Sequence, residues 1–139
     1  MIVLDTNVVS ESLRPQPAPE VVEWIASTEA DGLLITAITA DEVLSGVEKM
    51  PSGRRRAELE AGVEELLDTY AERVLDFDLP AARIHARMWA ARRSAGRPLP
   101  LADGMIASLC RREEASLATR NVRDFEGLGI RLVNPWEPR

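Results

Sequence analysis

Short apolar runs alternate along the chain with longer segments in which apolar residues recur at helical spacing. The short runs predict five strands, near residues 2–4, 33–36, 73–76, 116–119 and 130–133. The longer segments predict six helices, at about residues 7–13, 19–28, 39–50, 53–70, 79–95 and 101–114. Strands that alternate with helices in this way are typical of βαβ units, so we expect an α/β fold around a mainly parallel sheet.

One predicted helix has clear signals at both ends. Thr39 precedes Glu42 by three residues, which is the spacing of a capping box and predicts a helix that opens at Thr39. Pro51 disfavours a helical backbone at Met50 and ends that helix. Residues 53–70 then form the second arm of a predicted helical hairpin.

Composition sets the class of protein. A chain of 139 residues, 45% hydrophobic and without internal repeats or a long linker, predicts one domain over residues 1–139 that needs no disulfide. Cys110 lies in an apolar helical stretch and is interpreted as a buried core thiol. Asp5 interrupts the apolar N-terminus too early for a signal peptide or a membrane span, so we expect a cytoplasmic protein with no membrane segment.

The net charge of −6 argues at first against a nucleic-acid ligand, since phosphate binding usually requires a basic surface. The acidic excess is concentrated early, because residues 1–50 carry nine acidic and two basic side chains, whereas residues 51–139 carry 14 and 15. Arginines therefore remain available in the second part, at residues 54–56, 92–93, 97 and 111–112. We interpret the run at 54–56 as a solvated helix start rather than an RNA contact.

Four carboxylates lie close to the predicted ends of strands and starts of helices. Asp5 comes directly after the first strand, Glu42 lies in the first turn after the second, and Asp124 lies just beyond the strand at 116–119. Asp103 lies in the first turn of its own helix. If the strands before Asp5, Glu42 and Asp124 are parallel neighbours, these residues share the edge of the sheet where open α/β folds bind ligands.

Each carboxylate also has a purely structural explanation. Asp5 is placed to cap a helix, Thr39 with Glu42 has capping-box spacing, and Asn121 with Asp124 nearly repeats it. Several carboxylates in one pocket nevertheless repel one another unless a cation, a shared proton or neighbouring arginines compensate. A hard divalent ion such as Mg²⁺ suits a carboxylate cluster without His or Cys. The candidate metal ligands are Asp5, Glu42, Asp103 and Asp124.

The histidine and the tryptophans are assigned structural roles. His85, the only histidine, lies in the middle of a predicted helix with apolar neighbours and is interpreted as a helix-face or core residue. Trp24, Trp89 and Trp136 are widely separated along the chain. We interpret them as core or dimer-interface residues rather than base-stacking platforms, since an RNA-stacking surface usually exposes several aromatic side chains together.

Five segments together resemble the PIN domain, and especially the VapC and FitB type toxins of bacterial toxin–antitoxin pairs. They are VLDTNVVSE (3–11), ITADEVLSG (38–46), LADGMIA (101–107), ATRNVRDF (118–125) and VNPW (133–136). Each segment alone is a weak signal, whereas the set, which runs in family order over nearly the whole chain, is highly specific.

The resemblance implies a three-layer α/β/α fold and a Mg²⁺- or Mn²⁺-dependent endoribonuclease. It assigns the four carboxylates as metal ligands and catalytic residues, with Glu42 favoured over its neighbour Asp41. The matching polar positions near the family's active site are Asn7, Thr119 and Asn121. Thr6 and Asn7 either orient ligands or a water molecule or simply start a helix.

The same resemblance implies a set of partners. These are RNA as substrate, a second copy of the chain in a homodimer, and an antitoxin whose C-terminal segment covers the pocket. Operator DNA is expected only through the antitoxin.

The expected chemistry is attack of a metal-activated water on a phosphodiester, which needs no Ser/His or Cys/His pair. A phosphoaspartate enzyme would also place an aspartate after the first strand, but it requires a second carboxylate two residues later, where this chain has Asn7. A catalytically silent module that acts only in a DNA-bound complex with its antitoxin remains the alternative.

Overall fold

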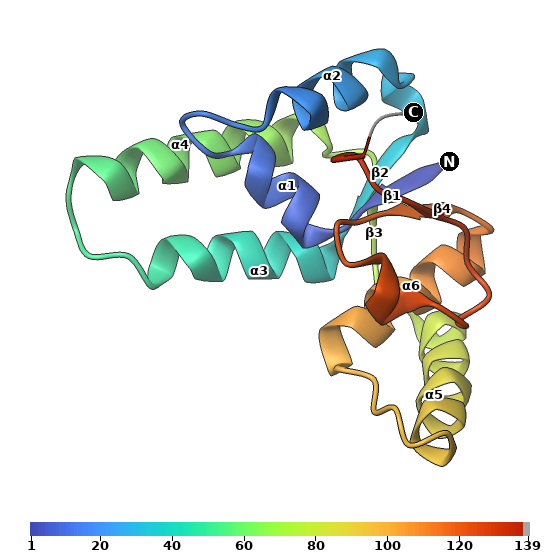
Figure 1. The fold of residues 1–139 in the computed structure, drawn as a ribbon. Helices are drawn as coiled ribbons and strands as arrows, with labels where there is room; N and C mark the ends of the chain where they lie inside the picture. Colours follow the sequence, from blue (N-terminus) through green and yellow to red (C-terminus); the bar gives the residue numbers. More distant parts are fainter. Residues whose placement is uncertain (138–139) are drawn as a thin grey trace.

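Residues 1–137 are described in the computed structural model of the chain. Within them, five strands form one parallel sheet of order β3-β2-β1-β4-β5 (Figure 1). The strands are β1 (Ile2–Leu4), β2 (Leu33–Thr36), β3 (Val74–Leu75), β4 (Ser116–Ala118) and β5 (Leu132–Val133). All five coincide with predicted strands, and β1, β2 and β4 are the parallel neighbours on which the predicted site depends.

The same residues form six α-helices and two short 3₁₀ turns. The helices are α1 (Thr6–Ser12), α2 (Pro19–Ser27), α3 (Ala37–Glu48), α4 (Arg54–Thr69), α5 (Leu79–Ser94) and α6 (Leu101–Glu113). The 3₁₀ turns, η1 (Ala30–Gly32) and η2 (Val122–Phe125), were not among the predicted elements. Helices α3 and α4 form the predicted hairpin and extend to one side of the sheet (Figure 1).

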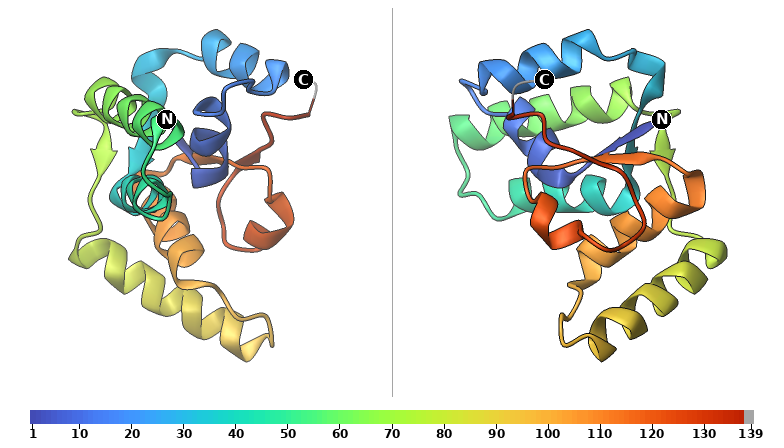
Figure 2. Two further views of the ribbon diagram at one scale, coloured as in Figure 1. Left: turned by 90° about the vertical axis from the view of Figure 1, so that its left-hand side faces the viewer. Right: turned by 45° about the vertical axis from the view of Figure 1, so that its right-hand side comes forward.

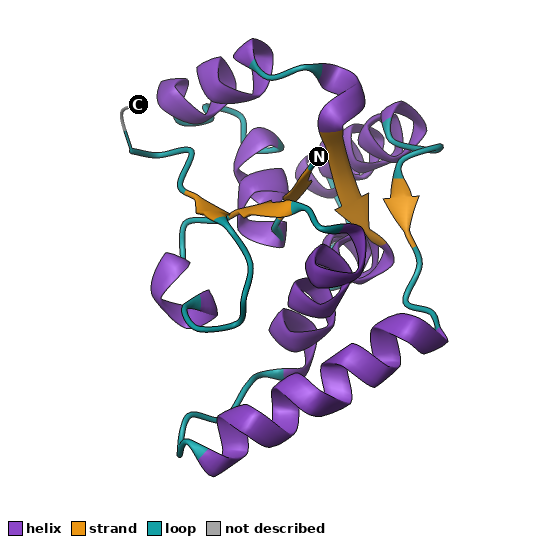
Figure 3. Ribbon diagram, turned by 90° about the vertical axis from the view of Figure 1, so that its right-hand side faces the viewer, coloured by secondary structure: helices purple, strands orange, loops and turns teal. Residues whose placement is uncertain are grey.

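Side chains that alternate along the strands pack into two hydrophobic cores, one on each face of the sheet. Leu4 and Ile35 pack with residues of α1 to α4, whereas Val3 and Leu34 pack with residues of α5 and α6. Each fully buried aliphatic side chain stabilises the fold by about 1.5–3 kcal/mol relative to its exposed state. Helices consequently cover both faces of the sheet, which confirms the expected three-layer architecture (Figures 1 and 3).

The start of α3 corrects one prediction. Thr39 does not open the helix, because Thr36 at the end of β2 supplies the cap: its Oγ1 accepts the Thr39 N–H at 3.1 Å. The Thr36 side chain is fully buried, so its hydroxyl is available to the backbone and not to water. The helix therefore begins at Ala37, and Glu42 lies in its second turn and not in the first.

Two side chains outside the site are placed as predicted. Cys110 is fully buried, and burial, followed by the charge of Asp5, raises the pKa of its thiol to about 12. His85 is partly buried on α5 against the α6 residue Gly104, where an added Cβ would stand 2.8 Å from its Nε2. Glycine at position 104 leaves room for the side chains of His85 and Leu99, which would have to shift for any larger residue. Among residues 1–137, no helix combines the length and the apolar character that crossing a bilayer requires.

Candidate active site

Asp5 lies at the centre of the carboxyl edge of the sheet. It follows β1, its backbone N–H donates to the Ala118 carbonyl of β4 at 2.9 Å, and its carboxyl group caps α1. Its side chain is only 5% exposed. The capping explanation and the cluster explanation for Asp5 are thus compatible, since one carboxyl oxygen serves the helix.

Three donors hold the Asp5 carboxylate. Oδ1 accepts the Thr6 N–H at 2.8 Å, while Oδ2 accepts the Thr119 hydroxyl at 2.7 Å and the Asn7 amide at 3.3 Å. The Asn7 amide also lies 3.2 Å from the Thr119 oxygen. Because three donors converge on one buried carboxylate, its orientation is set by the protein before any ligand arrives.

The same polar groups fix the segment that follows β4. The side-chain oxygen of Asn7 accepts the Arg120 N–H at 3.3 Å, and the Thr119 oxygen accepts the Asn121 N–H at 3.0 Å. Asn121 contributes this backbone group, and its side chain makes no cap for η2, so the capping-box interpretation of Asn121 with Asp124 is wrong. The 3₁₀ turn η2, which carries Asp124, lies in the loop between β4 and β5 (Figure 2).

Thr6 joins Asp5 to Glu42. Its hydroxyl lies 2.7 Å from Oε1 of Glu42, to which it donates, and 2.9 Å from the Thr39 hydroxyl. Thr39 is fully buried, and its hydroxyl is also 3.5 Å from that of Thr36. A chain of three hydroxyl groups therefore connects β2, α3 and α1 beneath Glu42. Thr36 and Thr39 were missed as site residues because the sequence pattern suggested only a helix start.

The four predicted carboxylates influence one another electrostatically. Burial raises the pKa of Asp103 to about 6, and the charges of Asp5, Asp124 and Glu42 contribute in that order. Burial also raises the pKa of Asp5, against the hydrogen bonds from Thr119 and Thr6, and Glu42 and Asp124 raise it further. Asp41 is exposed and accepts the Ser45 hydroxyl at 3.3 Å. The structure thus brings Glu42 to the cluster and leaves Asp41 on the outer face of α3.

This donor set fits a divalent cation in its chemistry. In residues 1–137, no three acidic, histidine or cysteine side chains converge closely enough to ligate one ion in their present positions. Glu42 and Asp124 are exposed, so packing does not fix the positions of these two carboxylates. Burial raises the pKa of both Asp5 and Asp103, the neighbouring carboxylates raise it further, and a bound dication would favour the ionised forms of both groups. Oxygen ligands of this kind are those that Mg²⁺ prefers.

A buried arginine on α5 supports the Asp124 segment. Arg92 is 8% exposed, and its Nη2 donates to the carbonyl oxygens of Asp124 at 2.8 Å and Glu126 at 3.1 Å. From the sequence, Arg92 is only one of the arginines available to bind phosphate. Its partners are backbone carbonyls, which leave no signal in a side-chain pattern.

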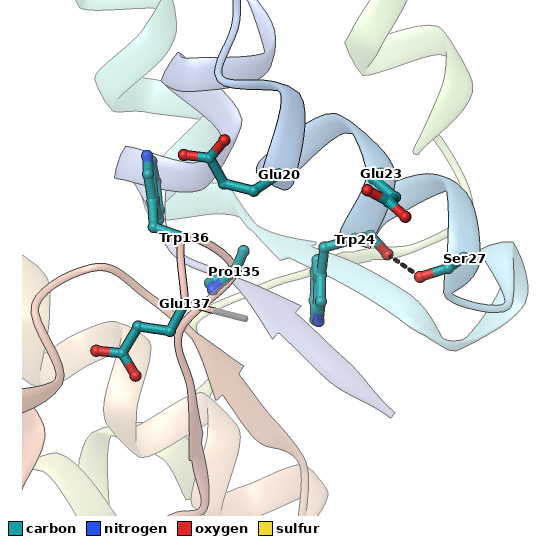
Figure 4. Close-up of a pocket in the computed structure, with 7 residues that line it drawn as sticks. All are labelled: Glu20, Glu23, Trp24, Ser27, Pro135, Trp136 and Glu137. Carbon is teal, nitrogen blue, oxygen red and sulfur yellow. Dashed lines mark hydrogen bonds between the residues drawn. The ribbon is translucent and has the colours of Figure 1, made fainter. Parts of the chain in front are cut away.

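A cavity of about 640 Å³ lies elsewhere, between α2 and the C-terminal segment (Figure 4). Trp24 and Trp136 line it together with three glutamates, Glu20, Glu23 and Glu137, and none of the four carboxylates of the cluster does. Trp24 is buried, as predicted for a core residue, and the Arg120 guanidinium lies 5.0 Å from the Trp136 ring. Three glutamates at its rim make this cavity unsuited to a phosphate group.

The chain is similar to known proteins over nearly its whole length. Residues 2–129 match the family model described as the PIN domain. The chain is 40% identical to "VapC ribonuclease Y4jK" of Sinorhizobium fredii and 36% identical to "Toxin FitB" of Neisseria gonorrhoeae, covering 99% and 98% of this chain and 99% of each relative. It is also similar to a chain in the solved "Structure of FitAB bound to IR36 DNA fragment", with a TM-score of 0.94, 36% identity, and coverage of 100% of this chain and 98% of that chain.

Proposed function

The chain belongs to the PIN-domain family, and on that premise we propose that it is a metal-dependent endoribonuclease, the toxin of a toxin–antitoxin pair. Two relatives that it matches over nearly their whole length support this proposal, one named a ribonuclease and the other a toxin. The observation that carries it is the proximity of four carboxylates: burial, followed by the charges of Asp5, Asp124 and Glu42, raises the pKa of Asp103 to about 6.

In this proposal Asp5, Glu42, Asp103 and Asp124 bind the cation and the surrounding polar groups orient them. A bound Mg²⁺ or Mn²⁺ would supply Lewis acidity, lowering the pKa of a water molecule and attracting the scissile phosphate. Thr119 and Asn7 donate hydrogen bonds to Oδ2 of Asp5. Thr6 donates its backbone N–H to Oδ1 of Asp5 and its hydroxyl to Oε1 of Glu42.

No side chain of the protein needs to act as a nucleophile in this chemistry. Cys110 is fully buried and the pKa of its thiol is about 12, so it is protonated and shielded at neutral pH. Water is then the attacking group, the phosphorus–oxygen bond to the leaving group breaks as the new one forms, and the four carboxylates provide the negative field that holds the cation.

The proposal includes partners. We infer a homodimer in the bacterial cytoplasm, where RNA is the substrate, and an antitoxin whose C-terminal segment covers the carboxylates. Operator DNA is bound only through that antitoxin. The solved relative described as FitAB bound to a DNA fragment supports this arrangement by analogy.

A pair of neighbouring carboxylates on α3 provides the test. The purified chain, free of partner, is incubated with a mixed RNA pool and Mn²⁺, with and without EDTA. We expect cleavage that EDTA stops, that Glu42→Gln strongly reduces and that the matched control Asp41→Asn retains. Both substitutions remove one negative charge from the same exposed helical surface, so only membership of the cluster separates them.

Other results would overturn the proposal. Equal activity of both variants would exclude the cluster as the active site. A metal-loaded wild-type chain that is inert, while its complex with antitoxin still binds operator DNA, would favour the catalytically silent module.

A further inference from the structure

A second cavity, of about 270 Å³, lies between α5, α6 and the loop that follows η2. Four arginines line it, namely Arg87, Arg92, Arg97 and Arg111. The only carboxylate in the lining is Glu126, and Met88 and Leu128 provide apolar surface. This arginine pocket is therefore strongly positive in a chain whose net charge is −6.

In the part of the chain that the structure describes, the arginines of the pocket form no ion pair with a carboxylate. Within residues 1–137, the arginines that form ion pairs are Arg14, Arg54, Arg56 and Arg112, all outside the pocket. The chain has 23 acidic residues, so partners are abundant. Four neighbouring positive charges repel one another, and an anion is the ligand that would relieve this repulsion.

Arg92 shows that the pocket is built and not merely exposed. Its side chain is 8% exposed, yet its hydrogen bonds to other groups of residues 1–137 use only Nη2. A guanidinium has five N–H donors, so Nε and Nη1 still have donors to offer a ligand. A buried charge without a counter-ion is costly, and a planar guanidinium is well suited to an oxyanion.

Arg111 lies beside the loop that follows η2, which contains two glycines with positive φ. Gly127 and Gly129 adopt φ values of +79° and +76°, in the left-handed region that favours glycine. A Cβ on Gly129 would stand 3.8 Å from Nε of Arg111, so the guanidinium lies against this loop.

The pocket shares a structural element with the carboxylate cluster. Arg92 contacts the carbonyl oxygen of Asp124, and Nη2 of Arg97 lies 3.5 Å from the carbonyl oxygen of Arg123, both in η2. The 3₁₀ turn that carries the proposed metal ligand Asp124 thus also contacts two arginines of the pocket. An RNA strand held at the cluster therefore has a positive site close to its path.

We propose that the arginine pocket binds a phosphate group, and that its occupant is a phosphate of the RNA strand outside the bond that is cut. The identity of the occupant rests on the proposed function, whereas the recognition of phosphate rests on the pocket alone. Charge-assisted hydrogen bonds from guanidinium groups supply the affinity.

The test compares two double variants with the same change of charge. Arg97→Gln/Arg111→Gln removes two exposed arginines of the pocket, and Arg83→Gln/Arg131→Gln removes two exposed arginines that do not line it. Binding of a short single-stranded RNA of mixed sequence is measured by fluorescence anisotropy in EDTA, so that the strand is not cut. Thermal unfolding of each variant verifies that the fold is kept.

We expect the pocket variant to weaken RNA binding by about tenfold, the loss of two charge-assisted contacts, and the control by much less. The slope of log K against log salt should fall by about 0.7 in the pocket variant, since one phosphate contact on a single strand contributes about 0.7. Equal losses in the two variants would overturn the proposal, because they would reflect net charge alone.

A calorimetric titration with inorganic phosphate distinguishes the two sources of the ligand. Phosphate could bind the wild type and not the pocket variant while both variants lose the same RNA affinity. That result would show that the pocket binds phosphate but not RNA. Cleavage is not a readout here, so an inert chain whose pocket variant still loses RNA would refute the catalytic proposal only. An active chain whose pocket variant binds RNA like the control would refute the pocket only.

Discussion

Asp5 and Asp124 follow neighbouring strands and belong to one cluster, but they differ in burial and in the hydrogen bonds of their carboxylates. Asp5 is 5% exposed and accepts hydrogen bonds from Thr6, Thr119 and Asn7. Asp124 is exposed on a 3₁₀ turn, and its backbone carbonyl, not its carboxylate, accepts the bond from Arg92. The first carboxylate is oriented in advance, whereas the second is only brought near.

This difference separates two tasks within the site. A preorganised ligand defines where a cation sits, and the ordering has been achieved on folding. An exposed ligand on a short turn adapts to the cation or to the substrate after binding. Glu42 is intermediate, since it is exposed but accepts the Thr6 hydroxyl. Substitutions along this series should therefore have graded effects.

The largest effect is expected for Asp5→Asn. We expect it to lower kcat/KM by more than about 100-fold, beyond what loss of an outer-shell partner of a metal site usually costs, with no rescue by added Mn²⁺. Asp124→Asn should lose about tenfold and should recover partly at higher Mn²⁺, because the remaining ligands still define the site. Initial rates over a Mn²⁺ titration measure both.

The control for this pair is stability without metal. Because burial raises the pKa of Asp5, its ionised form disfavours folding at neutral pH, so Asp5→Asn should raise the Tm in EDTA or leave it unchanged. If Asp124→Asn loses as much activity as Asp5→Asn at every Mn²⁺ concentration, the two carboxylates do not differ in their roles.

The contrast also explains how much of the fold followed from sequence. Periodicity located every strand and helix of the sheet layers, because apolar alternation and helical spacing are local signals. The start of α3 was misplaced by the Thr39–Glu42 spacing, which resembles a capping box. Instead, the buried Thr36 caps the helix, because β2 leads directly into α3. This depends on tertiary placement, which the local sequence does not show.

The site was predicted in the same uneven way. Motif positions identified the four carboxylates together with Thr6, Asn7, Thr119 and Asn121, and the structure brings the carboxylates within electrostatic reach. The roles of Thr39 and Arg92 in the site were not predicted, because Thr39 acts through a buried hydroxyl and Arg92 binds backbone carbonyls. Neither interaction has a spacing rule, since the partners come from distant segments.

A smaller effect is expected when the support of Asp5 is removed and Asp5 itself is kept. Thr119→Val deletes the hydroxyl that donates to Oδ2 at 2.7 Å and accepts from Asn121, with little change of shape. We expect a loss of about 10- to 100-fold in Mn²⁺ affinity, typical of outer-shell partners, measured by calorimetry.

Thr119→Ser is the matched rescue variant, because it restores the hydroxyl without the methyl group. It should return Mn²⁺ affinity to within a few-fold of the wild type. If Thr119→Val binds Mn²⁺ as tightly as Thr119→Ser does, the hydrogen bond does not orient Asp5, and preorganisation is not what distinguishes Asp5 from Asp124.

The smallest effect concerns Asp103 and pH. Its pKa is about 6 in the folded chain against an ordinary value of 3.8, so the folded state binds more protons than the unfolded state between these values. Stability without metal therefore falls as pH rises from about 4 to about 6, and the contribution is constant above about 7. Partial exposure of Asp103 screens the effect, and we expect a decrease in Tm of roughly 3–6 °C.

Thermal unfolding in EDTA across this pH range measures the effect, and Asp103→Asn should flatten most of it, with Asp5 accounting for the rest. Asp78, whose pKa is lowered by the Ala81 N–H and Arg112, acts in the opposite direction but only below about pH 4, outside this window. At pH 7, Mn²⁺ should raise the Tm of the wild type but not that of Asp103→Asn. An identical pH profile in both proteins would mean that Asp103 is solvated like an ordinary surface carboxylate. The cluster would then contain one constrained member, Asp5, and the repulsion that a cation is proposed to relieve would be too weak to organise the other three.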